Sequence, residues 1–180
     1  MPDSSLDDAA RLAAARGGDL GAFESLVRSY TPLVYAHALR FFGDPGAAED
    51  VVQEVWMKVF RSLDSFDERS RFTTWLYRVT RNACLDAVRA GQRRPIPVDT
   101  LDPVPLPGDL ADEVALTASV EHAMRALMPE DKDAFSAVAL FGLTYAEAGE
   151  ALGVPAGTVK SRVFRARRSL AHLLDLEGGA

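Results

Sequence analysis

Apolar side chains recur at helical spacing along most of the chain and predict an all-α protein. In segment 44–63 they fall on one face of a helix, and Asp44-Pro45 supplies an N-cap followed by a proline at the first helical position. Two shorter helices are predicted on either side of Thr31-Pro32, over 23–30 and 33–39. Runs of alternating β-branched residues bounded by turns are absent, so we expect no strands. The apolar positions of the 44–63 segment are Val51, Val52, Val55, Trp56, Val59, Phe60 and Leu63.

Segment 71–89 predicts an amphipathic helix whose polar side is rich in arginine. At about 100° per residue, one cluster of side chains forms the expected buried face: Phe72, Trp75, Leu76, Val79, Ala83 and Ala87. The side chains expected opposite or beside it are Arg71, Thr74, Arg78, Arg81 and Arg89. A helix tuned only for solubility would mix Glu with Lys, whereas these positions are nearly all Arg. The polar loop before this helix has the length to receive an unstacked base.

The C-terminal part of the chain predicts a helix-turn-helix. One helix is expected over 135–141, preceded by Pro129-Glu130, and a second begins after Thr144, which forms a capping box with Glu147. Gly153 is the expected left-handed stop, and a long helix follows from Thr158. A short helix, a tight turn and a longer basic helix are typical of a unit that places its second helix in the DNA major groove. An ordinary corner between two helices is the alternative.

The long C-terminal helix has distinct apolar and basic faces. The expected core positions are Val159, Val163, Ala166, Leu170 and Leu173, and the opposite side carries Ser161, Phe164, Arg165 and Arg168. Lys160, Arg162 and Arg167 flank the core stripe. An aromatic ring opposite the core lowers solubility unless something covers it. Thymine methyls or sugar edges could cover Phe164, with Lys160 and Arg165 on phosphates or guanine edges. Packing of Phe164 against other helices remains the alternative.

A proline-rich segment separates two helical parts. Residues 95–113 contain five of the ten prolines of the chain, five acidic residues and no basic one. Repeated prolines remove backbone donors and fix φ, so neither a helix nor a central strand suits this stretch. The expected organisation is a module over 1–94, a flexible acidic linker over 95–113 and a second module over 114–180.

The charge is strongly uneven along the chain. The 180 residues carry a net charge of −6, but segments 71–94 and 158–172 each carry +5, which leaves −16 on the remainder. Two compact basic patches on an acidic body favour two separate contacts with a polyanion. Two solvated helix faces are the ordinary alternative. With 48% hydrophobic and 26% charged residues, the composition is that of a globular protein.

Several classes of protein are not expected from the sequence. No apolar run is long enough for a membrane span, and the acidic N-terminus lacks the pattern of a secretory signal, so we expect a cytoplasmic protein without membrane insertion. Cys84 is the single cysteine, so neither an internal disulfide nor a multi-cysteine zinc site can form, and packing is its expected role. The three histidines are scattered, and no metal or other cofactor is expected. Motifs of catalytic sites are absent, so an enzyme is not expected.

Three stretches together resemble bacterial RNA polymerase sigma factors of the extracytoplasmic-function (ECF) type. EDVVQEVWMKVF (49–60) and FTTWLYRVTRNACLDAVR (72–89) resemble sigma region 2, and LTYAEAGEALGVPAGTVKSRVFRARRSL (143–170) resembles region 4. The GTVKSR junction followed by RARR is the most specific part. The resemblance implies a subunit that binds core RNA polymerase and directs promoter-specific initiation. It also implies control by an anti-sigma factor, which this group commonly has.

The resemblance implies roles for individual residues, and none of them is catalytic. Matching positions that grip the clamp of the polymerase large subunit are Asp50, Gln53 and Glu54, of which Gln53 lies at the edge of the apolar stripe. Positions in the part that binds and melts the −10 element are Arg69, Arg71, Thr74, Arg78, Arg81, Asn82 and Arg89. Positions that read the −35 element are Thr158, Lys160, Ser161, Arg162, Phe164, Arg165 and Arg168. The linker matches the segment that threads the polymerase channels.

The sequence departs from the family pattern at Ala148-Gly149, where a bulky aliphatic residue and an alanine are usual. A glycine inside a helix costs about 1 kcal/mol relative to alanine, and the small Ala148 buries less apolar area. We therefore expect this departure to lower local stability more than function.

The charge distribution predicts that the isolated chain binds DNA weakly. A patch of five charges offsets only a few phosphates, and the acidic remainder repels DNA, so affinity should fall steeply with salt. Core polymerase would tether both modules and raise their effective concentration on the promoter. A stand-alone helix-turn-helix regulator is the alternative, but it needs neither the acidic start of the 44–63 helix nor the long linker.

Overall fold

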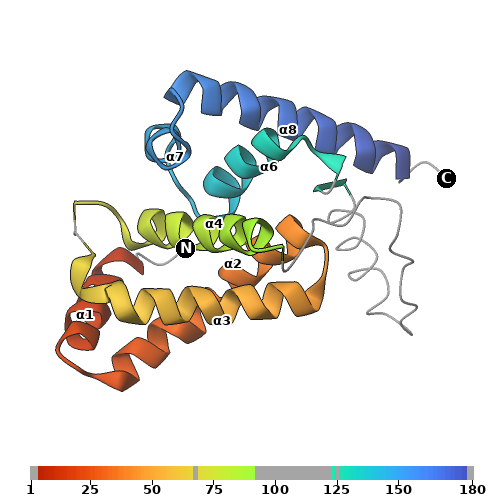
Figure 1. Cartoon of the computed structure of the whole chain (residues 1–180). Helices are drawn as coiled ribbons and strands as arrows, with labels where there is room; N and C mark the ends of the chain where they lie inside the picture. Colours follow the sequence, from red (N-terminus) through yellow and green to blue (C-terminus); the bar gives the residue numbers. More distant parts are fainter. Residues whose placement is uncertain (1–3, 67–68, 92–122, 125, 178–180) are drawn as a thin grey trace, which may run out of the picture. The chain divides into compact units, whose positions relative to one another are not determined.

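The computed structural model describes residues 4–66, 69–91, 123, 124 and 126–177. All regular elements in these ranges are helical, which confirms the predicted all-α class (Figure 1). The chain divides into two compact units, Met1–Arg94 and Pro95–Ala180. The predicted linker over 95–113 lies outside the described residues. The helices are α1 (Ser4–Arg16), α2 (Leu20–Phe42), α3 (Pro45–Ser62), α4 (Phe72–Arg89), α6 (Pro129–Phe135), α7 (Tyr145–Leu152) and α8 (Ala156–Glu177).

The N-terminal unit is built from α1 to α4, and local signals fix where α2 and α3 begin. Asp19 accepts a hydrogen bond from the backbone N–H of Ala22 at 3.1 Å and caps α2. Asp44 accepts from the N–H of Ala47 at 2.6 Å and caps α3, with Pro45 at the first position as predicted. Between them, Gly43 ends α2 in the left-handed conformation at φ 69°.

The prediction of two short helices around Pro32 is wrong, because α2 runs unbroken through it. A proline inside a helix removes one backbone hydrogen bond, and from the local sequence alone it therefore predicts the end of a helix. Tertiary packing outweighs that loss here: Leu26 before the proline and Val34 and Ala38 after it are completely buried. Directly beside Pro32, Thr31 accepts a hydrogen bond from the indole Nε1 of Trp56 in α3 at 3.0 Å.

Helix α4 packs against both α2 and α3, and its buried surface is broader than the sequence predicted. Phe72, Leu76 and Ala83 are buried as expected, but Trp75, Val79 and Ala87 are only half-buried. The core also includes Tyr77, whose ring meets that of His37 in α2 edge-on at 5.6 Å between centroids. The further buried positions on this side of α4 are Thr74, Thr80 and Cys84. The burial of Cys84 agrees with its predicted packing role.

The C-terminal unit contains the predicted helix-turn-helix. The hydroxyl of Thr144 accepts from the N–H of Glu147, and the Glu147 carboxylate accepts from the N–H of Thr144 at 2.8 Å, so the capping box is confirmed. Gly153 ends α7 at φ 69° as predicted, and α8 starts at Ala156, two residues earlier than expected. Before α7, α6 continues into a π-helical segment, Ser136–Leu140. Met124 and Leu127 pack on Ala166 of α8.

Gly149 in α7 has a structural reason that the sequence did not reveal. A Cβ at this position would lie 2.7 Å from the carbonyl oxygen of Val154 and 3.3 Å from the backbone nitrogen of Ala156. The N–H of Val154 donates to the carbonyl of Gly149 at 2.9 Å, which holds the turn against the helix. The close approach of backbone to backbone leaves no room for a side chain at this position. The cost of glycine relative to alanine that helix propensity predicts therefore omits a steric term at Gly149.

Candidate nucleic-acid and protein interfaces

The outer face of α3 carries the three residues matched to polymerase binding. Asp50 and Gln53 are exposed, and the side chain of Glu54 is 45% exposed. The Glu54 carboxylate lies 3.6 Å from Nζ of Lys58, one turn further along the helix. At i, i+3 and i+4 the three side chains share one face, so a partner can contact all of them at once.

A groove runs between α3 and α4 beside this face. It has a volume of about 410 Å³, and Asp50, Glu54 and Lys58 line it from α3. From α4 it is lined by Ala83, Ala87, Ala90 and Asp86, whose carboxylate accepts from Lys58 at 3.1 Å. Three carboxylates, those of Asp50, Glu54 and Asp86, against the single ammonium of Lys58 make the lining of this groove acidic overall.

Two exposed apolar side chains extend the same face of α3. Met57 is 45% exposed and Phe60 is 57% exposed, at i+4 and i+7 from Gln53. The prediction that Phe60 belongs to the buried stripe is wrong: its ring meets that of Phe23 edge-on at 5.2 Å between centroids, and more than half of the side chain is exposed. Met57 was missed altogether, although its spacing from Asp50 and Gln53 was a usable signal.

Arg16 and the ring of Phe66 make the contacts that fix residues 63–66, where the polar segment before α4 begins. Arg16 of α1 donates from Nε to the carbonyl of Leu63 at 3.1 Å and from Nη2 to the carbonyl of Phe66. Its guanidinium also lies over the Phe66 ring, 5.5 Å from the centroid. The buried Phe66 ring packs on Phe72 and Trp75 at 6.0 and 5.1 Å between centroids, so this residue is fixed against the first turn of α4.

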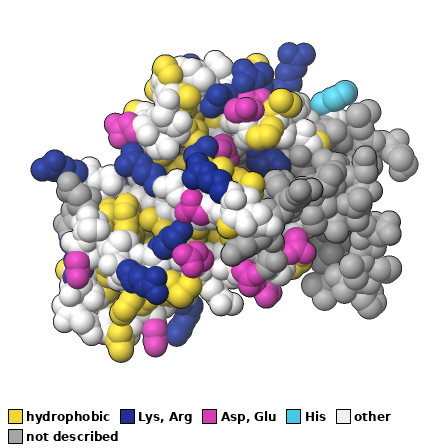
Figure 2. All heavy atoms as spheres, in the orientation of Figure 1, with side chains coloured by type: hydrophobic (Ala, Val, Ile, Leu, Met, Phe, Trp, Pro, Cys, Tyr) yellow, Lys and Arg dark blue, Asp and Glu magenta, His cyan; other side chains and the backbone are white. Residues whose placement is uncertain are grey.

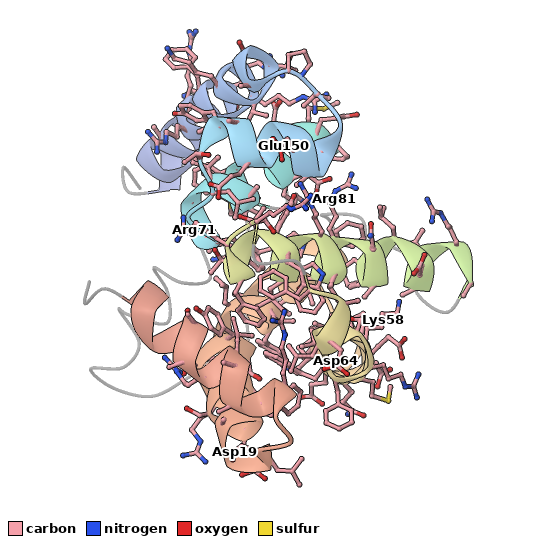
Figure 3. The ribbon with its side chains drawn as sticks, turned by 90° about the vertical axis from the view of Figure 1, so that its left-hand side faces the viewer. Asp19, Lys58, Asp64, Arg71, Arg81 and Glu150 are labelled. Atoms are coloured by element: carbon pink, nitrogen blue, oxygen red, sulfur yellow. The ribbon has the colours of Figure 1, made fainter. Side chains whose placement is uncertain are left out.

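The residues matched to −10 binding fall into three groups. Exposed side chains are those of Arg69, Arg71, Asn82 and Arg89, and half-buried ones are Arg78 and Arg81. Figure 3 shows Arg71 at the beginning of α4 and Arg81 further along it, on the opposite side of the helix from Lys58. Thr74 is 1% exposed, so its expected place on the polar side is a wrong prediction. Because Tyr77, one turn away, packs on α2, the buried arc of α4 extends round to Thr74.

Helix α8 presents a basic outer face with one aromatic ring on it. Lys160, Ser161, Arg165 and Arg168 are exposed, whereas Thr158 and Arg162 are half-buried. Phe164 is 67% exposed, which argues against packing on the helices of its own unit. The predicted core positions Val159, Val163 and Ala166 are buried, and the side chain of Leu173 lies outside the described residues. Lys and Arg side chains lie along the upper rim of this unit, over α8 (Figure 2).

One arginine of this face is joined to another helix. Arg165 donates from Nε to Oδ2 of Asp131 at 3.0 Å and from Nη2 to Oδ1 at 2.6 Å. The hydrogen bonds to this carboxylate raise the pKa of Arg165, and the negative charge of the carboxylate is the second cause. Asp131 carries no signal of this role in the sequence, because 34 residues separate it from Arg165 and no local pattern links them.

The described part of the chain lacks two other kinds of feature. No group of three or more His, Cys, Asp or Glu side chains there could hold a metal ion. Among the same residues, no helix has the length and hydropathy needed to cross a membrane.

Family models match both units of this chain. Sigma-70 region 2 matches residues 26–94, and sigma-70 region 4 matches residues 117–170. The two regions lie in the two helical modules and define the chain as a sigma factor, which is not an enzyme. Together with the relatives below, they show that this chain belongs to the ECF RNA polymerase sigma factors, as the sequence predicted.

Curated relatives and solved structures agree with this assignment. The ECF sigma factor SigE of Mycolicibacterium smegmatis is 36% identical over 85% of this chain and 62% of its own length. SigM of Mycobacterium tuberculosis is 34% identical over 93% of this chain and 84% of its own length. Among solved structures, CnrH in complex with the cytosolic domain of CnrY has a TM-score of 0.69 at 28% identity, covering 94% of this chain and 97% of that one. RpoE in complex with the anti-sigma factor NepR from Bartonella quintana has a TM-score of 0.66 at 27% identity, covering 85% and 96%.

Proposed function

We propose that this sigma factor engages its partners through three separate surfaces. The outer face of α3 binds the clamp of the polymerase large subunit, the start of α4 binds the −10 element, and α8 reads the −35 element from the major groove. The first surface is acidic with an apolar extension, and the other two are basic. Since a bacterial chromosome lies in the cytoplasm, we propose that the chain acts there.

The exposed ring of Phe164 is the observation that carries the proposed DNA surface. A phenylalanine that is 67% exposed leaves much of its apolar area in water, at a cost of about 25 cal/mol per Å². In the major groove that ring can cover a thymine methyl group. Exposed Lys160 and Arg168 on the same helix supply charges for the flanking phosphates. An exposed aromatic ring surrounded by cations suits a groove of DNA better than it suits solvent.

The −10 surface includes the exposed arginines at the start of α4. Arg69 and Arg71 flank the entry to the helix, next to the loop that Arg16 and Phe66 hold in place. Two adjacent cations at this entry suit a melted strand, whose phosphates need neutralising while a base is drawn out of the stack. Buried Thr74 is not part of this proposed surface.

The mixture of acidic and apolar side chains on the outer face of α3 supports its proposed role in binding polymerase. Asp50, Gln53 and Glu54 provide polar groups, and Met57 and Phe60 provide area that a partner can cover. Interface cores are enriched in aromatic residues and methionine, with polar groups at the rim. A protein partner therefore fits this face better than DNA, which the carboxylates would repel.

We further propose that an anti-sigma factor holds this chain inactive. The support is similarity: one solved relative with a TM-score of 0.66 is described as a complex with an anti-sigma factor. Proteins that co-purify with this chain from its source, identified by mass spectrometry, would test this point.

Transcription with purified core polymerase tests the proposed function as a whole. Run-off transcription from a library of genomic fragments, with and without this chain, identifies the promoters that depend on it. On those promoters Phe164→Ala and Lys160→Ala are expected to reduce initiation. A pull-down in which both variants retain core as the unaltered chain does shows that the loss lies at the DNA. The control is Arg28→Ala, which removes an exposed cation from α2. Unchanged initiation by both α8 variants would contradict the proposed role of α8.

The polymerase surface is tested separately by pull-down. Gln53→Ala combined with Glu54→Ala is expected to reduce the amount of core retained while leaving helix content unchanged. Glu24→Ala, which removes an exposed carboxylate from α2, is the control. Full retention of core by the double variant would overturn the proposed placement of this surface.

A further inference from the structure

The outward-facing Arg165 of α8 is anchored by a carboxylate that comes from α6. Two hydrogen bonds, at 3.0 and 2.6 Å, join its Nε and Nη2 to the two oxygens of Asp131. The two side chains differ in exposure: that of Asp131 is 10% exposed and that of Arg165 is 58% exposed. The pair thus has a buried anchor and an accessible end.

The geometry of the pair leaves one edge of the guanidinium available. Arginine has five N–H donors in a fixed plane, and Asp131 takes the one on Nε and one of the two on Nη2. Both donors of Nη1 and the second donor of Nη2 remain. One donor of Nη1 and the second donor of Nη2 form the end of the guanidinium, which is the edge that matches the O6 and N7 acceptors of guanine or two phosphate oxygens. Binding to Asp131 and binding to a base can therefore take place together.

The anchor belongs to a helix that packs firmly on α8. Asp131 is in the first turn of α6, and its backbone N–H donates to the carbonyl of Met128 at 3.0 Å. Phe135 of α6 and Leu170 of α8 pack against the same cluster of Met124, Leu127 and Ala166. Asp131 therefore has a fixed place relative to the helix that carries Arg165.

We propose that Asp131 is a positioning residue for promoter reading, which holds Arg165 with its free edge ready for one base pair of the −35 element. This inference rests on the proposed function of α8 as the DNA-reading helix. A long arginine side chain loses rotamer freedom when it binds, and prior fixation removes most of that cost at the correct base pair. Fixation also prevents the guanidinium from reaching acceptors on a wrong base pair. The consequence is discrimination rather than overall affinity.

A competing role for Asp131 predicts the opposite sign. If the carboxylate only withheld Arg165 from DNA, its removal would strengthen binding to every sequence. Removing one negative charge near DNA would also strengthen binding to every sequence, through the electrostatic term alone. Glu130 offers a matched control for that term, because it is the exposed neighbour of Asp131 on α6 and has a charge interaction with Arg165.

The experiment measures base discrimination by the holoenzyme. Core polymerase carrying the full chain is bound to promoter DNA in which each −35 base pair is replaced in turn. The chains compared are the unaltered chain, Arg165→Ala, Asp131→Asn, Glu130→Gln and the double variant Arg165→Ala with Asp131→Asn. Arg165→Ala identifies the base pair that Arg165 reads. We expect Asp131→Asn to reduce discrimination about 3- to 10-fold at that base pair alone, and to have no further effect in the double variant.

The outcomes separate the inference from the function on which it rests. Discrimination lost at the Arg165 base pair with Asp131→Asn, and retained with Glu130→Gln, supports the positioning role. Equal behaviour of Asp131→Asn and Glu130→Gln, with discrimination retained, would overturn it while leaving Arg165 as a reader of DNA. If Arg165→Ala changes no base preference, the proposed role of Arg165 itself fails, and the inference fails with it.

Discussion

The carbonyl oxygen of Val154 lies 2.7 Å from the point where a side chain on Gly149 would begin. We predict that Gly149→Ala destabilises the C-terminal unit by about 1–3 kcal/mol, because the added methyl group must push the turn away from α7. Helix propensity alone predicts the reverse, a gain of about 1 kcal/mol. The free energy of unfolding from urea denaturation of the full chain distinguishes the two.

A second glycine provides the control for this substitution. A Cβ at Gly157, in the first turn of α8, meets nothing within 4 Å. Gly157→Ala should therefore be neutral or slightly stabilising. If Gly149→Ala proved as stable as Gly157→Ala, the proposed steric reason for the glycine would be wrong.

The exposed Met57 on α3 is predicted to contribute to binding of core polymerase. Met57→Ala should weaken the binding of core about fivefold, because covering a half-exposed methionine contributes about 1 kcal/mol. The measurement is a titration of labelled chain with core polymerase. Met128→Ala, which truncates a 66% exposed methionine before α6, is the control. Equal affinities of the two variants would remove Met57 from the proposed surface.

Arg16 is predicted to act on DNA opening through the loop before α4. Lysine cannot reproduce both the paired hydrogen bonds to Leu63 and Phe66 and the contact with the Phe66 ring, so Arg16→Lys should destabilise the loop by about 1–3 kcal/mol. Amide hydrogen exchange should speed up at residues 63–66, and permanganate reactivity of promoter thymines should fall while core binding is kept. Exchange no faster than in Arg28→Lys, an exposed arginine on α2, would contradict this prediction.

His37 is predicted to make the N-terminal unit sensitive to acid. Burial lowers its pKa to about 3, with smaller contributions from the charges of Arg40 on α2 and Arg81 on α4. The unfolded chain takes up this proton near pH 6.5 and the folded chain does not, so stability is full above that pH and declines as the pH falls toward 3. At pH 5 the loss from this group is about 2 kcal/mol.

Replacement of the histidine tests this pH dependence. His37→Met keeps an apolar side chain of similar size in the core and should flatten the fall in unfolding free energy between pH 7.5 and 5. His172→Gln, at an exposed position of α8, should leave the slope unchanged. All three proteins have the same carboxylates, so the difference in slope reports His37.

Much of the helical architecture could be predicted from the sequence, because it depends on neighbours within one or two turns. The Asp44 cap, the Thr144–Glu147 capping box and the Gly153 stop each involve residues no more than four apart. The apolar stripe of α8 follows from one helical period. The chain segments that resemble regions 2 and 4 could likewise be recognised directly from their residues.

Predictions failed where a second helix determined the outcome. Pro32 does not end α2, because burial on either side outweighs one lost hydrogen bond. Thr74 is buried because α4 packs against more than one helix, and Phe60 is exposed because α2 covers only part of its ring. A projection of one isolated helix contains no information about how many neighbours it has.

The sequence by itself determined the helical class, the caps, the basic face of α8 and membership of the family, since these follow from local spacing and residue type. Only the tertiary structure decided that Asp131 meets Arg165 and that Val154 excludes a side chain at Gly149. The second contact depends on how the turn after α7 folds back onto the end of that helix. The first depends on the distance between two helices that pack together in space. That distance is set by the volumes of the side chains between the elements, and no periodicity along the chain encodes it.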